Sequence, residues 1–298
     1  MSSGPVSVTL PLRHTNGKEP EKNLMKTGQI IAFLREFAPP VLAEDWDNTG
    51  LLIGRESSDI SRILTCLTLT PDVATEAIES RVQLIVTHHP VLFRAVRQIV
   101  DSDSEGRMLL DLIESGIGVY SPHTSYDSAR SGINQQLAAA LGLQSIQPLR
   151  IPAEPVADAT SDTEHAAIAG LGSGRFGDLA EDTSVADLLE LTKAALQISN
   201  TQFVGDLTQR VNRVGIACGA AADFLRDAAE AGCQVLLTGE ARFHACLEAR
   251  TRDIALILPG HYATERPAIE QLAKILGERF PELQVFASQA ETDPVRWT

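Results

Sequence analysis

The sequence predicts an α/β fold made of two related, duplicated α/β lobes. Between residues 62 and 87, two apolar strand patterns flank an amphipathic helix, which is typical of a β-α-β unit. The same order of patterns returns between residues 213 and 238. With 298 residues, of which 44% are hydrophobic and 21% charged, the chain is long and apolar enough to form the core of such a fold.

The two β-α-β units align with each other without a gap, and we interpret them as copies from an internal duplication. Identical residues pair across the alignment: Arg62 with Arg213, Ala77 with Ala228, Glu79 with Glu230, Gln83 with Gln234 and Thr87 with Thr238. The alignment also sets His88-His89 opposite Gly239-Glu240 at equivalent strand ends. Because open α/β sheets bind ligands at the carboxyl ends of their strands, both loops are expected to face one shared cleft.

The remaining elements follow from apolar periodicity and from turn residues. In the first half, helices are predicted at residues 27–38, 71–80 and 108–114, and strands at 51–54, 62–69, 82–87 and 118–121. In the second half, a helix is predicted at residues 221–232, strands at 213–218, 233–240, 254–260 and 283–288, and a closing helix after residue 260. This pattern divides the chain into a disordered tail (1–25), a first lobe (26–150), a linker (151–165) and a second lobe (166–298) whose part 259–298 completes the shared site.

Charge and cysteine content exclude several classes of partner. The chain carries 25 basic and 39 acidic residues, and its net charge of −14 would repel a phosphate backbone, so nucleic acid is not expected as a partner. No apolar run reaches the length of a membrane span, and no membrane association is expected. The 4 cysteines are scattered without a C-x-x-C pair, which favours a reducing, cytoplasmic setting.

Two adjacent histidines, His88 and His89, follow a predicted buried strand. Side chains next to each other in a strand point to opposite faces, but Pro90 ends the strand, so both imidazoles are expected to turn toward one cleft. Neighbouring ligands of this kind suit two metal ions close together. Taken alone, the pair is also consistent with two unrelated loop histidines.

Two further clusters occupy the same kind of position. His123 and Asp127 follow the predicted strand at 118–121, and His261 and Glu265 open the closing helix, where a spacing of four places them on one face. Each cluster alone has a simpler interpretation, as turn residues or as a surface pair. Together, however, His88, His89, Asp127, His261 and Glu265 provide the imidazoles and carboxylates that suit two divalent ions of Zn, Mn, Fe or Co.

Three other residues near strand ends are weaker candidates. Glu240 in TGEARFH is a candidate general acid or base or, alternatively, a cap of the next helix. His244 is a candidate substrate contact, but we favour the alternative that it lies on the side of that helix. The GSGRFG stretch matches a dinucleotide-binding pattern but lacks the later ribose-binding acid, so it is interpreted as a tight turn. In that turn, Arg175 is a candidate contact for an anionic substrate.

Five motifs resemble those of the GTP cyclohydrolase 1 type 2 homologues, also called the Nif-three-like family. They are WDNTGLLIG (Trp46 to Gly54), VTHHPVLF, HTSYD, TGEARFH and GHYATER, in the family's order, and the resemblance covers nearly all of residues 26–290. It implies two α/β lobes, a dinuclear metal site between them and a ring-shaped homohexamer. It also implies that His89 and Asp127 bind one metal, that His88 and His261 bind the other, and that Glu265 bridges them.

Two residues depart from the family pattern beside this site. Thr68 replaces the family's usual aspartate, and Phe243 replaces the first histidine of a common pair after TGE. These departures bear on the choice of substrate more than on metal binding.

The expected function is that of a metal-dependent hydrolase acting on a nucleotide or related small molecule. Two bound metals would activate water, and Glu240 and His123 are the candidates for moving protons. The alternative is a non-catalytic metal-binding protein, such as a metal chaperone or a regulatory scaffold. Water-filled coordination positions facing a cleft would favour the enzyme.

Overall fold

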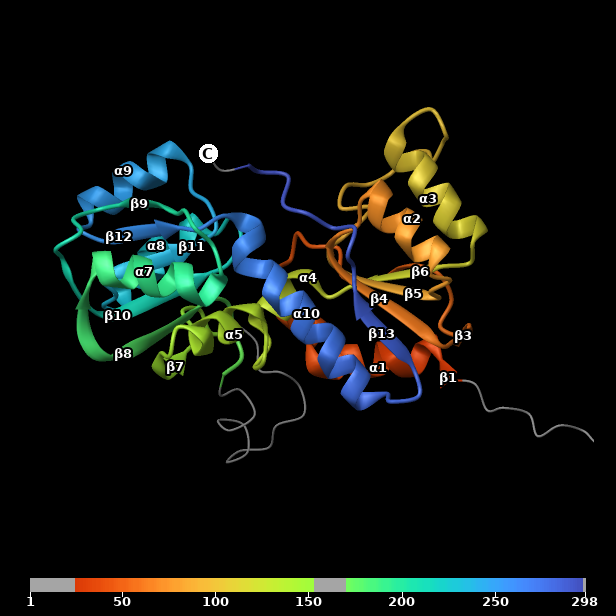
Figure 1. Cartoon of the computed structure of the whole chain (residues 1–298), viewed down its shortest axis with the longest axis horizontal. Coiled ribbons are helices and arrows are strands. Elements are labelled where there is room, and N and C mark those ends of the chain that lie inside the picture. Colours follow the sequence, from red (N-terminus) through yellow and green to blue (C-terminus); the bar gives the residue numbers. More distant parts are fainter. Residues whose placement is uncertain (1–24, 153–169, 297–298) are drawn as a thin grey trace, which may run out of the picture.

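The computed structural model describes residues 25–152 and 170–296. Nearly all of the predicted tail (1–25) and linker (151–165) therefore lies outside the described residues. The described residues fold into two α/β lobes joined along the long helix α10 (His261–Arg279), as Figure 1 shows, and this confirms the predicted fold class.

The first lobe is a five-stranded sheet with helices on both faces (Figure 1). Its strand order is β13 (Gln284–Ala287), β4 (Arg62–Thr68), β5 (Leu84–His89), β6 (Gly118–Ser121) and β2 (Gly50–Ile53), and only β2 runs antiparallel to its neighbour. Helices α2 (Pro71–Glu79) and α3 (Ser104–Glu114) pack on one face, and α1 (Thr27–Phe37) and α10 pack on the other. A small antiparallel pair, β1 (Met25–Lys26) and β3 (Asp59–Ile60), and the short helix η1 (Pro40–Leu42) lie outside this sheet.

The second lobe is a six-stranded sheet that repeats much of this plan. Its strand order is β7 (Gln144–Gln147), β8 (Arg175–Ser184), β10 (Arg210–Ala217), β11 (Val235–Thr238), β12 (Ala255–Leu258) and β9 (Gln202–Val204), with only β10, β11 and β12 parallel to one another. Helices α8 (Leu225–Glu230) and α9 (Phe243–Thr251) cover one face, and α5 (Ile133–Ala140) and α7 (Val185–Leu196) the other. The short helices η2 (Ala222–Phe224) and α4 (His123–Ser128) follow β10 and β6.

The duplication extends to individual hydrogen bonds. In the first lobe, Gln83 Oε1 accepts from the backbone nitrogens of Ser61 (2.9 Å) and Arg62 (3.0 Å). In the second, Gln234 Oε1 accepts from those of Asn212 (3.0 Å) and Arg213 (2.9 Å). Each residue in the first set of hydrogen bonds aligns with its counterpart in the second set, which supports a common origin for the two units.

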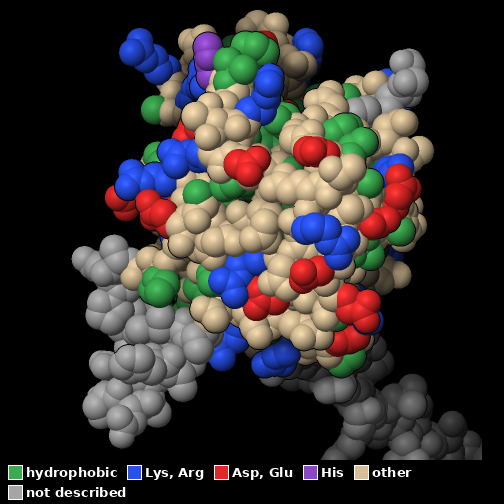
Figure 2. All heavy atoms as spheres, turned by 90° about the vertical axis from the view of Figure 1, so that its left-hand side faces the viewer, with side chains coloured by type: hydrophobic (Ala, Val, Ile, Leu, Met, Phe, Trp, Pro, Cys, Tyr) green, Lys and Arg blue, Asp and Glu red, His purple; other side chains and the backbone are tan. Residues whose placement is uncertain are grey.

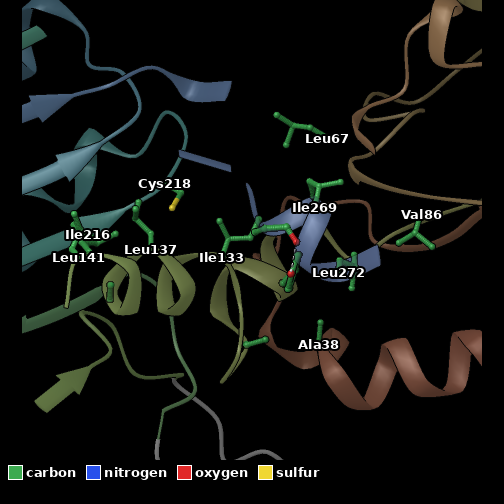
Figure 3. Packing of buried hydrophobic residues seen from close by; sticks show 14 of the residues in the cluster. Ala38, Leu67, Val86, Ile133, Leu137, Leu141, Ile216, Cys218, Ile269 and Leu272 are labelled. Carbon is green, nitrogen blue, oxygen red and sulfur yellow. Dashed lines mark hydrogen bonds between the residues drawn. The ribbon is translucent and has the colours of Figure 1, made fainter. Parts of the chain in front are cut away.

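The two halves of the chain exchange edge strands. β7 precedes the linker but pairs with β8 of the second sheet, and β13 comes from the end of the chain but pairs with β4 of the first. The largest hydrophobic cluster also spans both lobes, and Figure 3 shows Val86 and Leu272 on one side of it and Leu137 and Ile216 on the other. The sequence division at residues 150–166 therefore does not coincide with the boundary between the sheets.

The helices and strands missing from the prediction include several with weak apolar patterns, although α7 was also missed and buries Val185, Leu188 and Leu189. α9 buries only Ala249, β8 has a largely polar sequence, and α4 was expected to be a turn. Strand β5 also continues through His89, two residues beyond its predicted end, because His89 pairs with Thr68 of β4. These elements are stabilised by tertiary contacts that a local pattern does not contain.

Two further observations concern the helices and the surface. None of the helices within residues 25–152 and 170–296 has the length and apolarity needed to span a membrane. On the face of the second lobe, Figure 2 shows basic and acidic side chains interspersed, so the positive charges on that face are not gathered into one patch.

Candidate metal centre

The six candidate side chains meet where the carboxyl ends of both sheets face each other. His88 and His89 end strand β5, and the other four lie in helices that follow the next strand of each lobe. His123 and Asp127 belong to α4, which follows β6, whereas His261 and Glu265 belong to α10, which follows β12. The predicted ligands therefore come together although they are far apart in the sequence.

Helices α4 and α10 are equivalent elements of the two lobes. Helix α4 follows β6, which is parallel to β5, and helix α10 follows β12, which is parallel to β11. Each of the two helices starts with a histidine that has a carboxylate four residues later. His123 and Asp127 thus correspond to His261 and Glu265. The symmetry ends at the neighbouring strands, because Gly239-Glu240 stands where the first lobe has His88-His89. The sequence contained this signal as two similar H-x-x-x-acid motifs.

The first group of candidate metal ligands consists of His88, His89 and His123. One nitrogen from each imidazole lies within 4.8 Å of the others. The ring centroids of His88 are 5.0 Å from His89 and 5.1 Å from His123, and Asp127 Oδ1 lies 3.6 Å from His88 Nε2. Three imidazoles and a carboxylate around one point are a suitable donor set for a divalent transition metal.

The second group consists of His89, His261 and Glu265. Glu265 Oε2 lies 3.2 Å from His89 Nε2 and 3.0 Å from His261 Nε2, and the two nitrogens are 3.3 Å apart. His89 therefore belongs to both groups. The buried Glu265 carboxylate lies deepest in this group, with 4% of the residue exposed.

Two buried polar atoms at this centre, His88 Nδ1 and Asp127 Oδ1, have no hydrogen-bond partner among the described residues. A buried polar atom without a partner is costly, and such atoms are rare in folded proteins. Both belong to predicted metal ligands. Each has a lone pair to offer a cation, so the residues present fit the metal ions that the family resemblance implies.

The protonation state of His88 and the crowding of two carboxylates also favour a cation. Burial lowers the pKa of His88 well below its ordinary value and so keeps this imidazole neutral, as metal binding requires. Burial and the nearby Glu265 raise the pKa of Asp127 well above its usual range. For Glu265, burial acts to raise the pKa, but hydrogen bonds to His261 and His89 outweigh it and hold the pKa below its usual range. A positive ion would relieve the crowding of these two carboxylates.

Three of the histidines are oriented by a second residue through Nδ1. His123 Nδ1 lies 2.7 Å from Asp47 Oδ1, His89 Nδ1 lies 2.7 Å from Thr68 Oγ1, and His261 Nδ1 lies 3.1 Å from Glu240 Oε1. Such partners fix the ring and leave Nε2 for a metal. The hydrogen bond to Glu265 and the contact with Glu240 raise the pKa of His261 to about 9.

Sequence reasoning missed Asp47 as part of this centre. Burial acts to raise its pKa, but the hydrogen bonds from His123 and Thr124 outweigh it and lower the pKa, so Asp47 is a carboxylate. The available signal was its place in the WDNTG motif.

Two glycines allow the chain to pass close to these ligands. A Cβ added to Gly219 would overlap the Glu265 carboxylate, and one added to Gly239 would overlap the backbone of Gly219 and His261. Gly219 also has a φ of +69°, which other residues adopt at a cost. In the alignment of the two β-α-β units, Gly219 and Gly239 correspond to Thr68 and His88 of the first lobe.

The centre opens into two clefts. A cleft of about 320 Å³ is lined by residues of both lobes, among them His89, Asp127 and Glu265, together with Trp46 and Arg150. Another, of about 520 Å³, is lined by Thr68, His89, Glu240 and His261 and by the last described residues of the chain. His89 and His261 line both clefts.

Arg175 is not available to a substrate, which corrects the interpretation from sequence. It is fully buried, with 0% exposure, and burial lowers its pKa to about 10. Its nitrogens donate to nearby oxygens, namely Gln135 Oε1 and the carbonyls of Ala129, Gly170, Gly172 and Gly174. Its role is to hold these chain segments together. His244 lies exposed on α9 beside Phe243, outside both clefts.

Comparison with known proteins places the chain in a family. Residues 25–294 match Duf34/NIF3 (NGG1p interacting factor 3). The chain belongs to the Duf34/NIF3 family. It is 31% identical to a GTP cyclohydrolase 1 type 2 homolog of Clostridium perfringens, over 91% of this chain and 98% of that protein. It is likewise 31% identical to NIF3-like protein 1 of Drosophila melanogaster, over 91% of this chain and 88% of that protein.

Solved structures of relatives have the same fold as this Duf34/NIF3 member. A hypothetical protein from Staphylococcus aureus matches with a TM-score of 0.82 and 28% identity, covering 93% of this chain and 100% of its own. A NIF3-related protein from Bacillus cereus also matches with a TM-score of 0.82, at 22% identity, covering 92% and 99% of the two chains. The resemblance inferred from the five motifs is thereby confirmed at the level of family and fold.

Proposed function

We propose that this Duf34/NIF3 member is a cytoplasmic, dinuclear metal-dependent hydrolase of a nucleotide or related small molecule. The observation that carries the proposal is the cluster of buried donor atoms on His88, Asp127 and Glu265 beside an open cleft, in which His88 Nδ1 and Asp127 Oδ1 have no hydrogen-bond partner among the described residues. Buried donors that face one another without partners are the arrangement expected of a cation site, and an adjoining cleft allows a substrate to reach it.

The contacts support a ligand assignment that differs in part from the one implied by resemblance. His261 and Glu265 would hold one ion, and His88, Asp127 and His123 the other, with His89 between the two groups. Asp47 already occupies His123 Nδ1, so Nε2 of that ring is free to bind. His123 is therefore proposed as a ligand instead of a proton carrier.

Bound metals would supply a water molecule that is acidic enough to form hydroxide near neutral pH. The chain itself would orient the reaction. Asp47 and Thr68 fix the rings of His123 and His89, and Glu240 can accept or donate a proton at its carboxylate beside His261. With 60% of its side chain exposed, Glu240 can also exchange that proton with solvent.

A second candidate function is metal delivery or a regulatory role without catalysis. The observation that favours it is the exposure of 35% of the His261 side chain, next to Glu240, in the cleft of about 520 Å³. A ligand that solvent can reach permits exchange of the metal with another protein. The two functions differ in whether the loaded protein turns over a substrate.

Metal content tests the proposal directly. Purified wild-type protein is expected to contain close to two divalent ions per chain, and His88→Ala/Glu265→Gln is expected to contain little metal because both groups lose a donor. Glu270→Gln is a matched control, since this residue lies on the same helix but exposes 68% of its side chain. Elemental analysis gives the answer, and equal, near-zero metal in wild type and double variant would sink the dinuclear proposal.

The catalytic part needs a separate measurement. Metal-loaded protein is screened against nucleotides and phosphoesters, and Glu240→Gln is expected to lower turnover while keeping the metal. Turnover that survives in a Glu265→Gln protein without metal would place the activity elsewhere. The homohexamer that the resemblance implies is tested on the same samples by sedimentation.

A further inference from the structure

Two large aromatic side chains lie exposed beside the candidate metal centre. Trp46 is 60% exposed and Phe93 is 49% exposed, and their ring centroids are 5.9 Å apart in an edge-to-face arrangement. Single exposed apolar residues are common on protein surfaces, but two aromatic rings in contact at the mouth of a polar site are not explained by packing.

The loops that carry these rings are fixed to each other. Asn48 Nδ2 donates to the carbonyl of Leu92 at 2.9 Å, which joins the loop of Trp46 to that of Phe93. Leu92 itself has a φ of +58°, a conformation that costs free energy in any residue with a side chain. Asp47 is anchored by His123 and Thr124. The two loops are therefore joined before any ligand arrives, which lowers the entropic cost of binding.

The pair adjoins a candidate ligand of the metal centre. The centroid of His123 lies 6.1 Å from that of Trp46 and 6.3 Å from that of Phe93. Trp46 also lines the cleft of about 320 Å³ together with the metal ligands. A ring that stacks on Trp46 would therefore lie beside His123, a proposed metal ligand.

The second lobe gives this cleft an apolar lining as well. Ala220, Ala221 and Phe224 line it from the segment that follows β10. Apolar side chains from both lobes, with polar groups at the base, suit a flat ligand that has a polar edge.

The charges of the cleft argue against a highly anionic ligand. Among the described residues that line it, Arg150 is the one lysine or arginine, whereas Glu44 and Asp223 add negative charge. Arg150 is already engaged, 2.7 Å from Asp227 and 3.6 Å from Asp223, and its guanidinium lies over the ring of Phe224. Apart from bound metals, the described part of the cleft offers no unpaired cation to a chain of phosphates.

We propose that Trp46 and Phe93 form a stacking subsite for the planar heteroaromatic ring of an uncharged substrate of the nucleobase or nucleoside class. The proposal rests on the proposed function, since it assumes that the ring is presented to bound metals. It narrows that function, because it favours a nucleoside over its triphosphate.

The test uses the full-length protein loaded with zinc. The chain has 2 tryptophans, so Trp297→Phe leaves Trp46 as the sole tryptophan emitter. Guanosine is expected to quench this emission, ribose to have no effect, and GTP to bind more weakly than guanosine. In calorimetry, Trp46→Ala is expected to weaken guanosine binding about tenfold or more, because stacking on one aromatic contributes about 1–3 kcal/mol.

Phe243→Ala is the matched control, since this aromatic residue is 72% exposed but does not line the cleft, and it should bind guanosine as the wild type does. Equal binding of guanosine by wild type and Trp46→Ala would overturn the proposal, as would GTP binding more tightly than guanosine. A smaller assembly in sedimentation of Trp46→Ala/Phe93→Ala would identify the pair as a subunit contact instead. Metal content is measured in parallel, because a metal-free wild type contradicts the proposed function itself and not only the stacking subsite.

Discussion

The candidate metal centre requires that residue 219 has no side chain. Even the Cβ of alanine would overlap the Glu265 carboxylate at this position. Glu265 has little room to move, because it is buried and contacts both His89 and His261. The placement of this carboxylate therefore depends on a glycine in the second β-α-β unit.

Gly219→Ala is expected to displace Glu265 and to lower the metal content measured by elemental analysis. Gly232→Ala is the matched control, because Gly232 also has a positive φ, of +76° against +69°, but a Cβ there meets nothing within 4 Å. Both substitutions should cost about 1 kcal/mol of unfolding free energy for the backbone alone. A Gly219→Ala protein with full metal content would show that Glu265 does not hold an ion.

Sequence motifs were informative for residues that offer metal donors. His88, His89, Asp127, His261 and Glu265 were predicted as one cluster, and the structure brings them together. Residues that act through others were harder to find. Asp47 contributes by orienting His123, and Arg175 is a buried residue that joins chain segments through hydrogen bonds. Neither role leaves a spacing pattern in the sequence, so neither was predicted.

The segment that follows β13 contacts the end of β4, next to the candidate metal centre. Glu291 accepts hydrogen bonds from the backbone nitrogens of Leu67 (2.9 Å) and Thr68 (2.6 Å) at the end of β4, and it lies 3.2 Å from the buried Arg266. Thr68 in turn contacts His89. Glu291 is thus a positioning residue, separated from the proposed metals by Thr68 and His89.

Glu291→Gln is expected to weaken zinc binding about tenfold, because partners that orient metal ligands affect affinity on that scale. The measurement is competition with a chromophoric chelator. Glu76→Gln is the matched control, since Glu76 holds the same segment through Ser288 Oγ and the backbone nitrogens of Gln289 and Ala290 but lies away from His89. If both variants bind zinc equally well, the contact with Thr68 has no effect on the metal site.

Strands with continuous apolar runs were predicted from sequence, and the short, largely polar strands β7 and β9 were not. Strands β4, β11 and β12 are buried almost throughout, so their composition alone identifies them. In contrast, β7 and β9 are short and largely exposed, and pairing with a neighbour defines them. Local patterns do not contain that information.

At the scale of the whole molecule, Arg175 links segments from both halves of the chain. It reaches Ala129, which follows α4, and the carbonyls that precede β8. Among the described residues, no carboxylate is a hydrogen-bond partner of Arg175, and carbonyl and amide oxygens take the place of a counter-ion. A buried cation satisfied in this way depends on the full set of donors that arginine provides.

Arg175→Lys is expected to lower the free energy of unfolding by about 3 kcal/mol, because a lysine cannot reach all of these oxygens and remains a buried charge. Urea denaturation of the metal-free protein measures the change without a contribution from bound metal. Arg226→Lys serves as the control, because Arg226 is 75% exposed on the surface and should change stability little. A similar loss in both variants would contradict the role of Arg175 as a tie between the halves.

The sequence predicted the duplication and the order of the main elements, but not the assembly of the edges. The alignment of the two β-α-β units depends on residues close together in the chain. The pairings of β7 with β8 and of β13 with β4 instead join segments whose partners lie elsewhere in the fold. Such pairings depend on three-dimensional proximity, which one sequence does not report.

The exchange of β7 and β13 has a consequence for cutting the chain. A cleavage between residues 152 and 170 would give two fragments, and each sheet would then contain a strand of the other fragment. The fragments would stay associated through the pairings of β7 with β8 and of β13 with β4. His88 and His89 would belong to one fragment, and His261 and Glu265 to the other. Although the chain contains two copies of one unit, each sheet now needs a strand from both halves, so neither half forms its complete sheet alone.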